Sequence, residues 1–595
     1  MSPESSPLSV AVDPSRWRLR AHPGTGGRHT WHYLETDEEA AAWPQSDLDK
    51  YWLGLPVDTP KSPPAATPME AARKGFRFFK SLQCQETGHW AGHTSGPMFP
   101  IPGFVFGSYI TGIELTNYQK TGLIQYLLKR AHPDDGGWGL HIEGKSTVFG
   151  TTLNYVALRI LGVDADHPAA IKARTTLHMI GGAQAIPSWG KLWLACLNLY
   201  DWDGMNPLPS EMWLLPYALP FSPGRFWVHA REAMMSMTQL HGLRKSVPLT
   251  PLILSLRDEI FTVPYDSIDW PSQLYNISAL DLHTRHTTLF KCINAVVSFY
   301  ERFQPQFLHS RAMAESLRQL KLVVEHSDGL CVSPVSYALV LVAIYQAEGP
   351  ESVHFQMLKK RFIDPFWISQ DGLLVCSTNG SQLWDTEFVA QAVVETGLAE
   401  EDENHQYVQK VLEFLDDAQI QSSPSILADN YRYPTKGAWS FSTREQGYTV
   451  SDTTAEALKA IIGLQSLPGY KPLISDQRLF DSVDLLLGMQ SSDGGFPSYD
   501  TLRAPQWVEL INASEIFGKI MVEYNYPECT TSIDAGIRLI MSRQQPNGEW
   551  LQEGVEGVFN KSCTLAYPNY KNIFTIWALG RYAKKYGEDA LPPVS

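Results

Sequence analysis

A short turn motif recurs along the chain and constrains its fold more than any other feature. The motif is usually a Gln, a polar spacer, a Gly, one further residue and then Trp or Phe. It occurs at 83–90, 134–138, 490–496 and 545–550, and in weaker form at 436–439. The Gln amide can cap a helix end and the Gly permits the turn. One instance would be an ordinary turn before a core aromatic residue, but several instances predict stacked helical repeats.

Apolar residues between these turns follow the helical period. From Met69 onward, Ala71, Ala72, Phe76, Phe79 and Leu82 form one face. The same spacing returns at 153–161, 337–346, 385–397, 454–464 and 481–489, and strand-like alternation is sparse. The pattern predicts an all-α fold. The longest apolar run, 338–345, is too short for a bilayer span of roughly 18–20 residues. We therefore expect a buried helix there, and any membrane contact should be peripheral or monotopic.

Charge and composition narrow the function classes. The 48 basic and 63 acidic residues give a net charge of −15, and no Lys- or Arg-rich stripe is present, so we expect no nucleic-acid partner. Aromatic residues make up 11% of the chain, which supplies π-faces beyond ordinary core needs.

The N-terminal region and the cysteines indicate the cellular location to expect for the protein. Residues 1–70 are rich in Pro, Ser and charge, and predict an extended N-terminal arm. The first ten residues have neither a basic start nor a long apolar run, so we do not expect secretion. The 7 cysteines include no Cys-x-x-Cys pair, which is typical of reduced intracellular thiols.

The sequence lacks the features that nucleotide binding and metal binding require. Residues 139–146 match a phosphate-loop pattern, but a polar turn precedes them where a buried strand is required. His283 and His286 have no carboxylate at ligand spacing, and no Asp-Asp-x-x-Asp cluster for a diphosphate-bound magnesium occurs. We expect no metal and no cofactor.

The most informative segment is 437–456, which contains Asp452 between upstream aromatic residues and a downstream apolar helix. Taken alone, it is typical of a helix start. Ser451 or Asp452 would be the N-cap of a helix over 453–464, and Glu456 would complete a capping box.

The same segment resembles a motif of the oxidosqualene cyclase family. Residues 450–456 are similar to its catalytic Asp-Cys-Thr-Ala-Glu motif, with Thr453 in place of Cys. The recurring Gln…Gly-x-Trp turns match the family as well. Further matching segments are 136–141, 146–150, 379–386, 557–563, Tyr567 and 573–581. The resemblance covers nearly the whole chain.

The resemblance implies an architecture and a location. We expect two α/α barrels, one inserted in the other, with the active cavity between them. The expected ranges are an arm over 1–70, a first barrel over 71–325 and a second barrel over 326–595, incomplete after Cys529. The family also implies a monotopic protein of the endoplasmic reticulum membrane or lipid droplets.

The resemblance further implies the reaction, the cyclisation of (S)-2,3-oxidosqualene to lanosterol or another tetracycle such as a protostadienol. By resemblance Asp452 is the acid that opens the epoxide, and it must be a neutral carboxyl in an apolar cavity. Cys529 supports it, and Thr453 could replace a second supporting thiol with a hydroxyl. A single Asp, rather than an Asp-x-Asp-Asp motif for bare alkenes, favours an epoxide substrate.

The remaining site residues follow from the same resemblance. His229 matches a histidine near the final proton loss, and Tyr499 matches a tyrosine near the later cation and could orient His229 by hydrogen bonding. The aromatic positions that line the path of the cation match Trp384, Phe441, Phe517, Phe559 and Tyr567. For each of these side chains, ordinary core packing is the alternative.

Two departures from the family matter. Thr94 stands where the family usually has a tyrosine that shapes the second ring. The chain also passes from 528–534 almost directly to 537–550, where family members carry roughly 130 further residues. A truncated, non-catalytic paralogue that binds lipid is therefore the alternative function.

Overall fold

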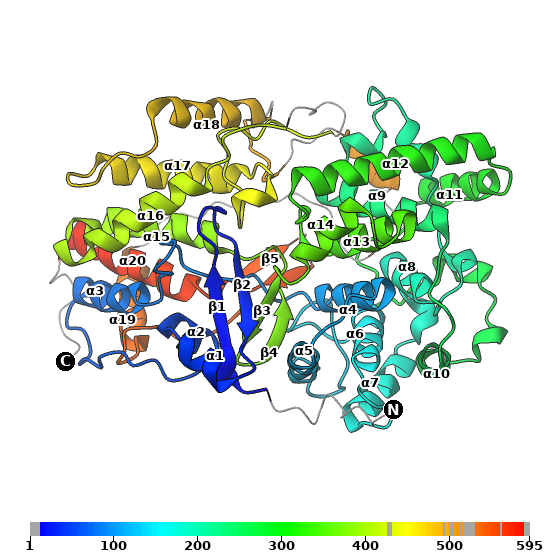
Figure 1. The fold of residues 1–595 in the computed structure, drawn as a ribbon, viewed down its shortest axis with the longest axis horizontal. Helices are drawn as coiled ribbons and strands as arrows, with labels where there is room; N and C mark the ends of the chain where they lie inside the picture. The colour runs from blue at the N-terminus through cyan, green and yellow to red at the C-terminus, as the bar shows by residue number, and fades with distance from the viewer. Residues whose placement is uncertain are drawn as a thin grey trace.

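The computed structural model describes residues 12–424, 431–491, 494–499, 504–511, 515, 530–559 and 562–587. Helices predominate, which confirms the all-α prediction, and the strands described form only two-stranded hairpins. Figure 1 shows two groups of helices side by side, with the N-terminal hairpin β1–β2 and the hairpin β3–β4 between them. No helix in the described ranges is long and apolar enough to cross a membrane.

The group at the left of Figure 1 combines the early helix α3 with helices from the C-terminal part of the chain. Helix α15 lies at its centre and packs against α16, α17 and α20, while α20 packs against α3. An early helix thus meets the last one, as the insertion of one barrel in another requires. The helices are α3 (Pro68–Lys80), α15 (Gln382–Thr396), α16 (His405–Ala418), α17 (Ser451–Ser466), α18 (Asp476–Met489), α19 (Thr530–Arg543) and α20 (Tyr570–Tyr586).

The group at the right of Figure 1 surrounds the expected buried helix. Residues 337–344 of α13 are buried, and α13 packs against α4 and α9. The helices are α4 (Pro100–Thr111), α5 (Asn117–Lys129), α6 (Val148–Ile160), α7 (Pro168–Met179), α8 (Ser188–Cys196), α9 (Val228–Leu243), α10 (Pro251–Ile260), α11 (Thr288–Glu301), α12 (Gln306–His326), α13 (Pro334–Glu348) and α14 (Val353–Arg361). Because α12 packs against α13 and α14, the expected boundary after residue 325 falls inside this group.

Tryptophans of the recurring turns bond to the ends of the preceding helices. The indole Nε1 of Trp90 donates to the Phe79 carbonyl at 2.7 Å, and that of Trp138 donates to Leu127 at 2.9 Å. Trp439 bonds in the same way to Leu415 at 2.9 Å, and Trp550 bonds to Ile540 at 2.8 Å. Each indole satisfies a helix-end carbonyl that has no partner inside its own helix.

Glutamines close the same turns from the other side. The side-chain amide of Gln83 donates to the Gly88 carbonyl at 2.7 Å, and that of Gln490 donates to Gly494 at 3.0 Å. At the fourth turn the bonding residue is Gln544 rather than Gln545, and it donates to Gly548 at 2.9 Å. Gly88 (φ 82°) and Gly548 (φ 103°) have left-handed backbone, and a Cβ there would meet a neighbouring carbonyl at 2.3 and 2.5 Å.

The N-terminal region is folded rather than extended. Strands β1 (Trp17–Ala21) and β2 (His29–Tyr33) pair antiparallel, and α1 (Asp37–Ala42) and α2 (Asp47–Trp52) follow. Buried tryptophans anchor this region, because Trp31 and Trp52 pack edge-on against Trp367 at 5.6 and 4.9 Å between ring centroids. Trp367 lies in the hairpin of β3 (Phe366–Ser369) and β4 (Gly372–Val375). The Pro- and Ser-rich composition misled the prediction.

Candidate active site

The site begins at the first turn of α17. Val450 is the N-cap and makes no side-chain capping bond, so Asp452 is the second helical residue and not a cap. The Glu456 carboxylate accepts from the Gln391 amide at 2.8 Å and from Lys459 at 2.9 Å. The capping box considered from the sequence is therefore absent, and Asp452 does not serve to start the helix.

Two donors hold the Asp452 carboxyl group. The Thr453 backbone N–H donates to Oδ1 at 3.0 Å, and the Ser498 hydroxyl donates to Oδ2 at 3.0 Å. Ser498 is fixed in turn, because its carbonyl accepts from the Ser451 N–H at 2.7 Å. The sequence analysis missed Ser498, although it directly precedes Tyr499, a predicted site residue.

Asp452 is crowded by protein and yet has accessible surface. The crowding raises the pKa of its carboxyl group, and the donors from Thr453 and Ser498 only partly oppose that rise. More than a third of the residue is nevertheless exposed, in contrast to the apolar cavity that the resemblance implies. A carboxyl group with a raised pKa and accessible surface is suited to deliver a proton to a bound molecule.

The expected supporting role of Thr453 takes a different form. Its hydroxyl is buried and has no hydrogen-bond partner among the described residues, and it is the backbone N–H that reaches Asp452. The second expected support, Cys529, lies outside the described residues, as does Phe517. The side chain of Phe559 is not described either, and its backbone pairs with Cys563 between β5 (Gly557–Phe559) and β6 (Cys563–Leu565).

The structure gathers the other predicted aromatic residues into one cluster. Trp384, from α15, stacks on Phe441 at 5.6 Å and donates from its indole to the Tyr570 hydroxyl at 2.6 Å. Tyr567 stacks on Tyr570 at 4.7 Å, and Phe388 meets Trp384 edge-on at 4.5 Å. Tyr570 and Phe388 were not predicted. Tyr570 lies just before the matching segment 573–581 and Phe388 lies just after 379–386, and this proximity was the available signal.

Electrostatic coupling joins this cluster to the acid. Burial, Asp385 and Asp452 raise the pKa of the Tyr567 phenol to about 12. Burial, Asp452 and Tyr567 likewise raise the pKa of Tyr499. Both tyrosines therefore stay neutral and present their rings and hydroxyls near Asp452.

The predicted histidine and tyrosine meet across the two helix groups. The His229 ring, at the start of α9, lies edge-on to Tyr499 with centroids 4.7 Å apart and planes at 89°, and it stacks on Trp227 at 4.2 Å. Burial, together with Arg231, lowers the pKa of His229 to about 3. The imidazole is therefore neutral at cellular pH.

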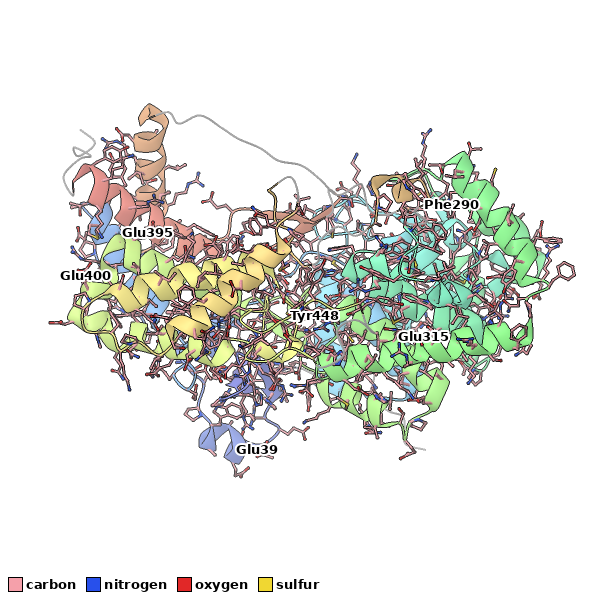
Figure 2. The ribbon with its side chains drawn as sticks, turned by 90° about the horizontal axis from the view of Figure 1, so that it is seen from above. Glu39, Phe290, Glu315, Glu395, Glu400 and Tyr448 are labelled. Atoms are coloured by element: carbon pink, nitrogen blue, oxygen red, sulfur yellow. The ribbon has the colours of Figure 1, made fainter. Side chains whose placement is uncertain are left out.

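A buried contact links the groups beside His229. The Tyr448 hydroxyl donates to the carboxylate of Glu232, one turn beyond His229, and the Val332 N–H donates to the same carboxylate at 3.1 Å. Arg432 lies over the Tyr448 ring at 3.8 Å. Figure 2 shows Tyr448 between the two groups of helices. The sequence analysis did not single out these residues.

Thr94, the residue at the first departure from the family, is buried beside the start of α15. Its hydroxyl lies 2.9 Å from that of Thr378, and its carbonyl accepts from the Ser377 N–H at 2.9 Å. The smaller side chain is thus fixed by hydrogen bonds to the loop before α15.

Comparisons with known proteins place this chain in a family. The Squalene-hopene cyclase N-terminal domain matches residues 77–367, and the Squalene-hopene cyclase C-terminal domain matches 380–516. A lanosterol synthase of Pneumocystis carinii is 40% identical over 708 positions, covering 97% of this chain and 98% of that protein. A protostadienol synthase A of Aspergillus fumigatus is 46% identical over 522 positions, covering 88% of this chain and 70% of that protein. The chain belongs to the oxidosqualene cyclase family, whose members are isomerase-type cyclases.

The first of these alignments also bears on chain length. Its 708 positions exceed the 595 residues of this chain by more than a hundred, so this chain must be gapped by at least that much within the alignment. The sequence analysis expects the missing stretch after Cys529, and that location stays a prediction.

Proposed function

We propose that this protein cyclises (S)-2,3-oxidosqualene to lanosterol. One observation carries the proposal. Asp452, a carboxyl group with a raised pKa and two hydrogen-bond donors, has accessible surface and lies close enough to Tyr567 and Tyr499 to raise the pKa of both phenols. This combination fits an acid that starts a carbocation cascade.

The first step is proton transfer to the epoxide. The Asp452 carboxyl gives its proton to the epoxide oxygen, a C–O bond breaks, and positive charge appears on carbon. Asp452 is then a carboxylate, and the Thr453 N–H and Ser498 hydroxyl stabilise it because both already point at its oxygens.

The charge then moves along the folded polyene. Aromatic faces stabilise a cation without forming a covalent bond to it. The stacked rings of Trp384 and Phe441, with Tyr567 close by, are neutral faces of this kind.

Proton loss ends the cascade, and His229 is the proposed acceptor. A low pKa is no obstacle here, since a proton next to a carbocation is far more acidic than an imidazolium. Burial instead keeps the imidazole neutral, and a neutral imidazole has one ring nitrogen that carries no proton. Tyr499 borders the ring edge-on and limits its orientation. The reaction is an isomerisation with a protein acid and a protein base, so the proposed mechanism needs no metal and no cofactor.

A protostadienol is the second candidate product. Identity to the Aspergillus fumigatus protostadienol synthase is the higher percentage, 46%, but over 522 positions only. Because 40% of 708 positions is the larger number of identical residues, and that lanosterol synthase is covered almost completely, we favour lanosterol.

The test is product analysis. The purified chain in detergent would be incubated with 2,3-oxidosqualene, and neutral lipids would be identified by gas chromatography and mass spectrometry. Lanosterol is expected, and protostadienol would establish the second candidate. Oxidosqualene that binds but stays unconverted would point to the non-catalytic, lipid-binding alternative.

We also propose monotopic membrane association, at the endoplasmic reticulum or lipid droplets. One face of α11 and the residues after it expose large apolar side chains, with Phe290 on the opposite, buried face (Figure 2). We call this surface the α11 face. It consists of Leu289, Ile293, Val296, Phe299, Phe303 and Phe307, which are 39–77% exposed. Contiguous apolar surface of this kind is typical of a membrane or protein contact.

The segment 211–221, which is apolar and rich in aromatic residues, adjoins the same region. Trp213 is buried, while Tyr217 and Phe221 are exposed. The Glu211 carboxylate lies 3.5 Å from His309 in the first turn of α12, two residues after Phe307. The segment is therefore buried at Trp213 and exposed at Tyr217 and Phe221, next to the α11 face.

A further inference from the structure

Helices α15 and α17 pack together and bring four carboxyl groups to one seam. Asp385 and Glu387 lie on α15. Asp452 and Glu456 lie four residues apart on α17, hence on one face. Glu387 interacts electrostatically with all three others. The mechanism above uses only Asp452, so the presence of Glu387 needs an explanation.

Glu387 is completely buried, with 0% of its surface exposed, and neither carboxyl oxygen has a hydrogen-bond partner within the described part of the chain. An ionised carboxylate in such a place is very costly. Burial and the neighbouring carboxyl groups of Glu456, Asp452 and Asp385 raise its pKa well above the ordinary value. Burial and these neighbours therefore both favour the protonated form of Glu387.

Lys459 and Arg581, the basic residues near the seam, pair with carboxylates other than Glu387. Lys459 on α17 bonds to Glu456 at 2.9 Å. Arg581 on α20 pairs with Glu395, two turns further along α15, at 3.4 Å. Asp385 accepts from Ser381 and from Asn569, both at 2.7 Å, and Asn569 and Ser381 are neutral.

Glu387 is also placed between the acid and a group that solvent reaches. Gln391, one turn after Glu387 on α15, donates to the Glu456 backbone and carboxylate at 3.2 and 2.8 Å. The α15 face with Glu387 and Gln391 thus opposes the α17 face with Asp452 and Glu456. The Glu456 side chain is 25% exposed.

We propose that Glu387 is a proton store that reloads Asp452 after each turnover. The inference rests on the proposed function, because it assumes that Asp452 gives up a proton to the substrate. The O–H bond of Glu387 then breaks and an O–H bond forms on Asp452, directly or through one water. Glu387 regains a proton from solvent by way of Glu456. It touches no reacting atom, and is therefore a positioning residue for the acid.

The test is Glu387→Gln, which keeps the size of the side chain and cannot pass on an acidic proton. Rapid-quench kinetics would separate the first turnover from later ones. We expect a first turnover within about twofold of wild type, followed by a steady state at least about tenfold slower. Glu387→Asp should restore much of the steady-state rate. Glu395→Gln, on the same helix but away from the seam, is the matched control and should behave as wild type.

A second measurement does not depend on catalysis. A folded-state pKa above the unfolded value of about 4.3 means that the folded protein binds more protons, so stability falls as pH rises above that value. Glu387→Gln removes this loss. The thermal midpoint of the variant relative to wild type should therefore rise as the pH increases above about 4.3.

Three results would overturn the proposal. They are an unchanged steady-state rate in Glu387→Gln, an equal loss of the first turnover and the steady state in a folded variant, and a midpoint difference that does not vary with pH. Absence of any product from wild type would instead overturn the proposed function and with it the reloading role, while the pH series would still decide whether Glu387 holds a proton.

Discussion

For single residues, burial sets the charge of both ends of the proposed reaction. It raises the pKa of the Asp452 carboxyl, which favours the protonated form, and it lowers the pKa of the His229 imidazole to about 3, which favours the neutral form. An acid needs its proton and a base needs its lone pair, and one physical cause provides both. The pKa of a free imidazole, near 6.5, would have been a poor guide to this site.

The distinct roles of the two residues give a prediction. His229→Ala should leave consumption of oxidosqualene within about tenfold of wild type, because Asp452 still starts the cascade. The products should scatter into incompletely cyclised or differently deprotonated triterpenes, since the final proton has lost its acceptor. Gas chromatography of neutral lipids, made in a host without its own cyclase, measures both quantities. A single unchanged product at normal yield would show that His229 is merely a core histidine.

Single elements are held by the turns that end them. At the weaker fifth turn, Trp439 bonds to Leu415 of α16, and Gln419 donates to the Gly437 carbonyl and to Ser482 on α18 at 3.3 and 3.1 Å. That glutamine lies 18 residues before Gly437, which is why the local motif seemed to lack one.

These hydrogen bonds predict how much stability the fold loses when one of them is removed. Trp439→Phe keeps an aromatic ring but leaves the buried Leu415 carbonyl without its donor, and should destabilise the fold by about 1–3 kcal/mol. Calorimetry should show a lower thermal midpoint, with the product unchanged. The control is Trp507→Phe, because Trp507 is 45% exposed. Equal midpoints for the two variants would contradict a stabilising role for the indole bond.

Over the whole molecule, the α11 face is expected to bind a membrane. Replacing Val296, Phe299 and Phe303 by Glu puts charges on this face without touching the buried side of α11. The variant should lose most of its cosedimentation with phospholipid vesicles, because a charged side chain resists burial in the lipid boundary.

The chain offers a matched control on α18. Phe480, Val483 and Leu487 are also exposed, at 61%, 37% and 61%, but they lie in the other group of helices. Their replacement by Glu should leave vesicle binding intact. Equal loss of binding in both variants would mean that the α11 face has no special role.

Local pattern predicted the helices, the buried run in α13 and the recurring turns, since each depends on residues close in sequence. Family resemblance also named residues that the fold brings together, such as His229 with Tyr499 and Trp384 with Phe441. It could not supply Ser498, Glu232 with Tyr448, or Glu387, because their significance lies in contacts between segments far apart in the chain. The folded N-terminal region was missed because its few buried tryptophans are outnumbered by Pro and Ser.

The most direct test of the account is the rate of oxidosqualene consumption by Asp452→Asn compared with wild type, measured on the purified proteins in detergent. The amide fits the same space but cannot deliver the proton. The account predicts a loss of at least about a thousandfold, with the thermal midpoint close to that of wild type. A rate near that of the wild type would contradict the assignment of Asp452 as the acid that starts the cascade.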